Sequence, residues 1–314
     1  MLRYNVATNQ QLPSWSLGGN LLGIDLSPDG KTLAIADSSE TGTNNWIHQV
    51  DVTTGVDTKK LFPLSFSEGG TYSVAYGSDG QILITSLFNG SGFTPLRRYD
   101  PAIDTTSIIL GNPSSPGMVS ASADRNTIGY IEGDISSGPL HQYDVRSGTL
   151  SPETRTDWFT FEVGVSRDGS QFAVPTYDGM FLYNSRLQKL ATIGDYANDG
   201  PISVAYSPNS DVMYVAWYSF GFSNEVRAYS TTDFRLLATW NVNGQFNWVG
   251  NGAYDEGRIK TSADGSLVFV TVDNGVSIIP VPEPTTGGLA IAGLLAVAGT
   301  RRKGRGRGQR PAHG

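Results

Sequence analysis

The sequence of 314 residues contains no cysteine and three histidines, and its formal net charge at pH 7 is −7. The absence of cysteine excludes thiol nucleophiles, disulfides and every cysteine-ligated metal site. Residues 1–280 carry 16 basic and 28 acidic residues, which excludes the clustered Lys and Arg of a nucleic-acid surface. Abundant glycine (38 residues), with 14 Tyr, 13 Phe and only 16% charged residues, indicates an all-β chain with many turns.

The first predicted elements form half of a repeat. Residues Leu2–Asn9 match a motif that recurs along the chain as the third strand of each repeat, and Leu12–Leu17 is predicted to be the fourth. No first or second strand stands before them, and Met1–Gln10 lacks the apolar stretch of an export signal. Both observations predict that this chain starts downstream of the natural start and that its N-terminal signal peptide is missing.

Six strand–turn–strand signals follow the half repeat. Each has an apolar strand, a turn of the Ser-x-Asp-Gly kind and a strand rich in Val, Ile, Leu and Tyr, which is the pattern of a β-hairpin. The turn residues are Asp29, Asp79, Asp124, Asp168, Asn209 and Asp264, spaced by 50, 45, 44, 41 and 55 residues. Calcium binding is an alternative role for these side chains, but they lack Asp-x-Asp spacing, so hairpin geometry is the preferred explanation.

A third strand is predicted after each hairpin, and after most of them a fourth. The third strands lie in Trp46–Gly55, Leu96–Asp100, Leu140–Gly148, Met180–Asn184, Val226–Ser230 and Val276–Ile279. The fourth strands lie at Leu61–Phe62, Ile108–Leu110, Leu190–Ile193 and Leu236–Trp240. Four strands in about 40–45 residues are typical of a β-propeller blade.

The turn Ser27-Pro28-Asp29-Gly30 and the strand after it resemble the repeats of YVTN-type and WD-repeat-like bacterial propellers. The resemblance implies an all-β propeller with four-stranded blades over residues 1–280, a fold that serves scaffolds, binders and enzymes alike. Seven third-strand candidates against six hairpins favour seven blades with the first incomplete. A six-bladed ring closed by residues 2–17 is the alternative, but the last repeat already has its own third strand.

The body of the chain shows no nucleophile elbow, zinc-binding helix motif or phosphate-binding loop. His48 and His141 hold equivalent repeat positions. A functional interpretation makes them metal ligands or bases that face a central channel. The preferred interpretation is a repeated half-exposed strand residue, since neither has an acidic residue at ligand spacing. The sequence therefore predicts no catalytic residue, no metal site and no cofactor.

Residues 241–257 lengthen the last repeat, and insertions in repeat folds gather on one face, often the binding face. Aromatic rings beside amides suit stacking on sugar rings or another flat ligand, although packing between blades is the preferred role of these aromatics. The candidate binding residues are Trp240, Asn243, Phe246, Asn247, Trp248, Asn251 and Tyr254.

The C-terminal part begins with Val281, Pro282, Glu283 and Pro284, whose prolines predict an extended linker over residues 281–286. The uncharged run 287–300 is apolar and rich in small residues, though shorter than the ~20 residues of a typical membrane span. A basic tail, 301–314, opens with Arg301, Arg302 and Lys303. Arginines directly after an apolar run mark the cytoplasmic side, so the run predicts a transmembrane helix with residues 1–280 exported.

This order of motif, apolar run and basic cluster resembles the PEP-CTERM sorting signal of Gram-negative bacteria. The resemblance implies export by the Sec machinery, membrane anchoring through residues 287–300 and processing near Glu283 by an exosortase-type enzyme. The extension from Gly304 to Gly314 departs from the pattern. A plain C-terminal anchor with a proline-rich stem is the alternative.

The sequence thus predicts an exported, envelope-sorted β-propeller that acts as a surface or extracellular-matrix binding protein, with a polysaccharide or protein ligand and no nucleic-acid partner. Two alternatives stay open. One is a propeller enzyme, lactonase-like or a metal-dependent hydrolase, with a site at the channel mouth. The other is a cytosolic scaffold in which residues 285–300 form an ordinary helix.

Overall fold

The computed structural model describes residues 1–281 apart from residues 66, 90–92, 114–115, 134, 136, 157–158, 195–198, 220–223, 247–257 and 274. The chain divides into two units, Met1–Val281 and Pro282–Gly314. The predicted sorting residues Pro282, Glu283 and Pro284, the run 287–300, and Arg301, Arg302 and Lys303 all lie outside the described residues. No helix long and apolar enough to cross a membrane occurs in the part of the chain that the structure describes.

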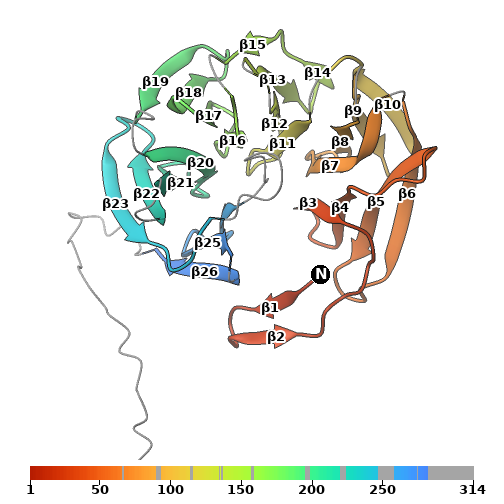
Figure 1. Ribbon diagram of the computed structural model, residues 1–314, viewed down its shortest axis with the longest axis horizontal. Coiled ribbons are helices and arrows are strands. Elements are labelled where there is room, and N and C mark those ends of the chain that lie inside the picture. The colour runs from red at the N-terminus through yellow and green to blue at the C-terminus, as the bar shows by residue number, and fades with distance from the viewer. Residues whose placement is uncertain are drawn as a thin grey trace, which may run out of the picture. The chain divides into compact units, whose positions relative to one another are not determined.

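Antiparallel β-sheets make up the described part of Met1–Val281, which contains no helix (Figure 1). The first three sheets in chain order contain β1 (Arg3–Asn5) and β2 (Gln10–Leu12); β3 (Leu21–Leu26), β4 (Thr32–Asp37), β5 (Asn44–Asp51) and β6 (Asp57–Pro63); and β7 (Glu68–Tyr76), β8 (Ile82–Phe88), β9 (Leu96–Asp100) and β10 (Thr105–Leu110).

The next two sheets contain β11 (Gly117–Ala121), β12 (Thr127–Glu132), β13 (Pro139–Asp144), β14 (Thr149–Leu150) and β15 (Thr154–Arg155); and β16 (Gly164–Val165), β17 (Gln171–Thr176), β18 (Gly179–Asn184) and β19 (Lys189–Ile193). The last two contain β20 (Asp199–Tyr206), β21 (Val212–Ser219), β22 (Asn224–Ser230) and β23 (Leu236–Asn241); and β24 (Ile259–Thr261), β25 (Leu267–Val272) and β26 (Gly275–Pro280). The predicted all-β class and the four-stranded repeat are confirmed.

Within Met1–Val281 the sheets follow one another in chain order around a common centre, as in a β-propeller (Figure 1). The first strand of each sheet from β3 onward lies innermost, and the strands then follow outward in sequence order, except that β14 and β15 both pair with β13 (Figure 1). This β-propeller-like fold places equivalent residues of successive repeats in equivalent positions.

The six predicted hairpin turns share one backbone geometry. In the first turn the Gly30 N–H donates to the Ser27 carbonyl, and the Asp29 carboxylate accepts bonds from the Ser27 hydroxyl (2.7 Å) and the Lys31 N–H (3.1 Å). The residue after the turn Asp or Asn has a positive φ in every repeat: Gly30, Gly80, Arg125, Gly169, Ser210 and Gly265. Glycine suits this left-handed position because it has no Cβ to clash.

The predicted half repeat is present as the two-stranded sheet β1–β2. Its turn matches the turns between third and fourth strands elsewhere: the Asn5 Oδ1 accepts the Thr8 N–H (3.1 Å), as the Asp144 Oδ1 accepts the Ser147 N–H (2.8 Å). The second strand is Gln10–Leu12, so the predicted strand Leu12–Leu17 is wrong: the left-handed Asn9 (φ 54) closes a tight turn that starts the strand earlier, and it ends at Leu12.

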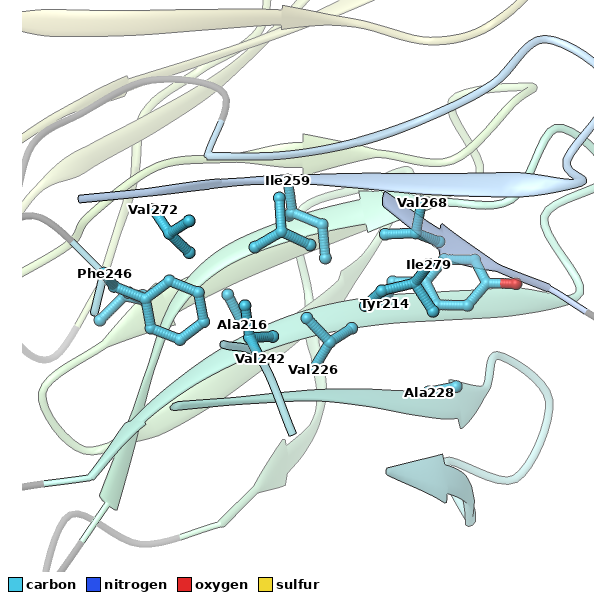
Figure 2. Close-up of a cluster of buried hydrophobic side chains, with 12 residues drawn as sticks. Tyr214, Ala216, Val226, Ala228, Val242, Phe246, Ile259, Val268, Val272 and Ile279 are labelled. Carbon is cyan, nitrogen blue, oxygen red and sulfur yellow. The ribbon is translucent and has the colours of Figure 1, made fainter. Parts of the chain in front are cut away.

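The core consists of separate apolar clusters, each shared between neighbouring sheets. Figure 2 shows the cluster in which Tyr214, Ala216 and Val226 of the β20–β23 sheet meet Ile259 and Val268 of the β24–β26 sheet. Burial of such aliphatic side chains contributes about 1.5–3 kcal/mol each. The sheets are therefore held face to face, and each sheet depends on its neighbours for its buried surface.

Candidate functional site

Buried polar side chains gather where the β3–β6 sheet meets the β7–β10 sheet. This polar junction comprises Asp37, Asn45, Trp46, His48, Asp57, Glu68, Thr71, Ser86 and Arg97. Asp37 ends β4, Trp46 and His48 lie on β5, and Asp57 begins β6, so three paired strands bring the first group together.

His48 is the centre of that first group. Its Nε2 lies 3.1 Å from the Asp37 Oδ2 and its Nδ1 lies 2.8 Å from the Asp57 Oδ2. The expectation of a half-exposed histidine at this repeat position is wrong, since His48 is fully buried and His141 is only 6% exposed. His141 bonds through Nδ1 to the Ser151 carbonyl (3.0 Å). Both rings are thus fixed by hydrogen bonds inside the protein.

The Asp37 carboxylate accepts four bonds. They come from the Trp46 indole N–H (2.8 Å), His48, and the N–H groups of Asn20 and Ser39 (2.9 Å each). Burial by itself raises the pKa of Asp37, but the bonds from Ser39, His48 and Asn20 outweigh it and lower the pKa to about 2. Asp37 is therefore an ionised, saturated acceptor at neutral pH.

Thr71 of β7 ties this group to the next sheet. The Asp37 N–H donates to the Thr71 Oγ1 (2.8 Å), and the Thr71 hydroxyl donates to the Trp46 carbonyl (2.6 Å). Beside it, a Cβ on Gly70 would lie 2.1 Å from the Ser38 carbonyl carbon. The two backbones therefore approach as closely as a glycine allows.

A buried ion pair forms the second group of the junction. The Arg97 guanidinium donates to both oxygens of Glu68, with 2.6 Å between Nη2 and Oε2, and to the Pro63 carbonyl (2.9 Å). The Asn45 amide (2.9 Å) and the Ser86 hydroxyl (2.6 Å) also donate to the Glu68 Oε1. Burial alone would raise the pKa of Glu68. The hydrogen bond from Arg97 and the positive charge of Arg97 together lower it by more, so the net shift of the Glu68 pKa is downward.

The junction is built for rigidity. Asp37 and Glu68 each accept four or more hydrogen bonds, and His48 is bonded through both nitrogens. Among the described residues no group of three His, Cys, Asp or Glu side chains is placed to hold a metal ion. Hydrogen bonds from Asp37 and Asn45 to Thr71 and Glu68 join the β3–β6 sheet to the β7–β10 sheet, and we assign the junction a structural role on these bonds.

The sequence did not reveal this junction. Asp37 and Asp57 stand 11 and 9 residues from His48, distances that carry no ligand signature, and only strand pairing brings them together. Glu68 and Arg97 lie in different strands, 29 residues apart. One signal in the sequence could have indicated a buried polar group: Asp37 directly follows the apolar residues of β4, within the strand.

Of the candidate binding residues, Asn247, Trp248, Asn251 and Tyr254 lie outside the described residues. Phe246 is 1% exposed and belongs to the cluster in Figure 2. Trp240 is partly buried with its ring 6.3 Å from that of Tyr214, whereas Asn243 is exposed. Phe246 and Trp240 thus pack on the core, and the proposed loop stays a prediction.

Two rows of apolar side chains are uncovered near the start of the chain. The β3 strip is Leu22, Ile24 and Leu26 of β3, which are 39%, 44% and 39% exposed. The β1 strip is Leu2, Tyr4 and Val6, which are 78%, 48% and 43% exposed.

No family model matches the chain, and no curated protein matches it. Among solved structures, 1118 chains are similar to it. One is the hydrazine synthase of Kuenenia stuttgartiensis, at 13% identity and a TM-score of 0.65, with 89% of each chain covered. At this identity the likeness shows the fold alone, so function has to be argued from the surface of this chain.

Proposed function

We propose that the protein is an exported, envelope-sorted β-propeller that binds a partner at the cell surface or in the extracellular matrix. The destination is supported by the order of Val281-Pro282-Glu283-Pro284, the apolar run 287–300 and Arg301–Lys303, which resembles a PEP-CTERM signal. Under this proposal the Sec machinery exports the chain, residues 287–300 anchor it in the membrane of a Gram-negative bacterium, and an exosortase-type enzyme processes it.

The proposed ring has seven blade positions, with β1–β2 as the outer two strands of an incomplete blade. Support comes from the turn of β1–β2, which has the geometry of the turns between third and fourth strands, and from β26, which already serves as the third strand of the last sheet. Figure 1 shows β1–β2 between the β24–β26 sheet and the β3–β6 sheet.

The binding role is carried by one observation: the β1 and β3 strips leave six apolar side chains exposed. Soluble proteins expose contiguous apolar patches mainly where they bind a partner. Apolar strips suit the alternating side chains of a protein partner better than the hydroxyl groups of a polysaccharide, so we propose a protein ligand.

The first test is the intact mass of the protein recovered from its native host. Loss of the residues from about Glu283 onward, with the protein in the envelope or medium, is expected from sorting. An intact Arg301–Gly314 tail on a cytosolic product would overturn the sorting proposal.

A further inference from the structure

The segment 242–246 leaves the end of β23 and is anchored in the core at both of its ends. Val242 is 8% exposed and Phe246 is 1% exposed, and both belong to the apolar cluster in Figure 2. The Val242 N–H also donates to the Asn224 carbonyl (2.8 Å). Between the two anchors the side chain of Asn243 is exposed. This segment opens the insertion that lengthens the last repeat.

Gly244, directly after Asn243, is required by the packing of this segment. Its φ of 131° lies in a region that residues with a side chain rarely adopt. A Cβ at this position would lie 3.0 Å from the Val272 Cβ and 3.0 Å from the Asp273 Oδ1. The backbone conformation and the lack of space both demand glycine, so an Asn-Gly dipeptide is built into the fold here.

The two groups that could react in this dipeptide are both free of hydrogen bonds. The Gly244 carbonyl accepts the Asn224 side-chain amide (2.7 Å), and the Gln245 N–H donates to the Asp273 Oδ1 (3.0 Å). Within the described part of the chain, the Gly244 N–H has no acceptor and the Asn243 amide has no partner. The glycine nitrogen and the asparagine side chain are therefore both available.

An asparagine beside an unhindered glycine nitrogen can lose its amide without an enzyme. The Gly244 nitrogen attacks the Asn243 Cγ and gives up its proton, the new N–C bond closes a cyclic imide, and the bond from Cγ to the side-chain nitrogen breaks as ammonia leaves. Water then opens the ring at either carbonyl carbon and leaves a carboxylate at position 243. Glycine has no Cβ to obstruct the attack.

We propose that Asn243 is a site of spontaneous covalent modification in the folded protein, at which a carboxylate replaces the side-chain amide. The inference stands apart from the proposed role at the cell surface. Asn241, two residues earlier, provides an internal comparison because its side chain is exposed as well. Its neighbour Val242 is β-branched and its N–H is bonded to Asn224, so Asn241 has no free nitrogen beside it.

The modification acts on the contact that fastens the start of the insertion to the end of β25. Gln245 and Asp273 exchange two bonds, from the Gln245 N–H to the Asp273 Oδ1 (3.0 Å) and from the Asp273 N–H to the Gln245 carbonyl (2.8 Å). A carboxylate at position 243 adds a negative charge next to the glycine that contacts Asp273, and like charges repel. Opening of the ring at the main-chain carbonyl also lengthens the backbone by one carbon. Both products loosen this contact.

The test follows the purified full-length protein, kept folded at 37 °C and pH 8 and sampled over several weeks. Pepsin digestion at low pH and fragmentation in the mass spectrometer assign each lost amide to a residue, and distinguish position 243 from Asn251, which also precedes a glycine. We expect conversion at Asn243 to be at least tenfold faster than at Asn241. It should be slower at pH 6, because the attacking nitrogen must lose its proton.

Two variants test the site and its consequence. Asn243→Gln places the amide one carbon further from the Gly244 nitrogen, so position 243 should keep its amide throughout the incubation. Asn243→Asp carries the charged product from the start. In hydrogen exchange the amides of Gln245 and Asp273 should exchange faster in Asn243→Asp and in incubated wild-type protein than in Asn243→Gln.

Three results would overturn the proposal. The first is equal conversion at Asn243 and Asn241. The second is conversion of Asn243 only after unfolding in urea, which would show that the fold protects the dipeptide. The third is unchanged exchange at Gln245 and Asp273 in the converted protein, which would remove the proposed consequence. None of these outcomes bears on the C-terminal processing that the intact mass measures.

Discussion

Arg125 is the residue that departs most clearly from the turn chemistry of its repeat. It holds the left-handed position (φ 58) that glycine holds in four of the other five hairpin turns, and it donates to both oxygens of Asp25, at 2.7 and 3.1 Å. The left-handed backbone of a non-glycine residue costs free energy, and the ion pair between the third hairpin and the first opposes that cost.

Two substitutions at Arg125 separate strain from pairing. Arg125→Ala keeps the strained backbone and loses the pair, whereas Arg125→Gly loses the pair and relieves the strain. We expect Arg125→Gly to be more stable than Arg125→Ala by about 1 kcal/mol in urea unfolding. As a control, both substitutions are repeated in the Asp25→Asn protein. The free energies of unfolding of Arg125→Gly and Arg125→Ala should differ there by the same amount. Equal stabilities of the two variants would show that the position is not strained.

Asp37 predicts an acid-sensitive contribution to stability. Its folded pKa of about 2 lies below the ordinary 3.8, so the stabilisation is complete above about pH 4 and is lost as the pH falls through the folded pKa. The shift corresponds to about 2 kcal/mol. Between pH 4.5 and pH 2 the wild-type free energy of unfolding should fall by about that much more than that of Asp37→Asn, measured by urea unfolding. Parallel curves would contradict the assignment.

Strand-level packing at the polar junction is set by Gly70. A Cβ there would lie 2.1 Å from backbone atoms of Ser38, whereas a Cβ on Gly69 would meet the Leu87 side chain at 3.3 Å. Gly70→Ala should therefore destabilise the protein by ~2 kcal/mol or more, because two backbones must separate, and Gly69→Ala should cost less. Thermal unfolding of the two variants checks this, and equal losses would mean that the sheets can slide apart.

The buried pair of Glu68 and Arg97 should be costly to break from one side. Arg97→Met leaves the Glu68 carboxylate buried without its countercharge, and such losses cost about 3–5 kcal/mol. Arg98→Met on the same strand is the matched control, because Arg98 donates to the neutral Tyr143 hydroxyl at a partly buried site (3.1 Å). Urea unfolding should separate the two variants, and adding Glu68→Gln to Arg97→Met should recover part of the loss.

The elements were predictable from the sequence where local chemistry decides them. The turn at Asp29 is determined by its local sequence. The Ser27 hydroxyl and the Lys31 N–H bond the Asp29 carboxylate, and Gly30 permits the left-handed backbone. The polar junction was not predictable, because His48 meets Asp37 and Asp57 only through the pairing of three strands. Nor was the β3 strip, since Ile24 has the same alternating pattern as the buried Val74 and only the absence of cover distinguishes them.

Within the unit Met1–Val281, the strands differ in how much of their apolar surface is buried, and this predicts that they differ in how readily they open locally. Local stability follows buried apolar contacts, so sheets with fewer neighbours open at lower free energy. We expect the backbone amides of β3, where Leu22, Ile24 and Leu26 are exposed, to exchange faster than those of β7, where every residue is buried. Hydrogen exchange followed by mass spectrometry checks this ranking. Uniform protection across the sheets would argue that β3 is covered in solution.

The hairpin turns also bear on how the molecule ages. Four of them are Asp-Gly dipeptides, at Asp29, Asp79, Asp168 and Asp264, the sequence in which aspartate most readily cyclises and isomerises. Ring closure needs the glycine nitrogen to attack the aspartate side chain. Here the glycine N–H is bonded to the turn carbonyl, and the carboxylate is held by a backbone N–H. Isoaspartate at these sites would therefore record how long each molecule had spent unfolded.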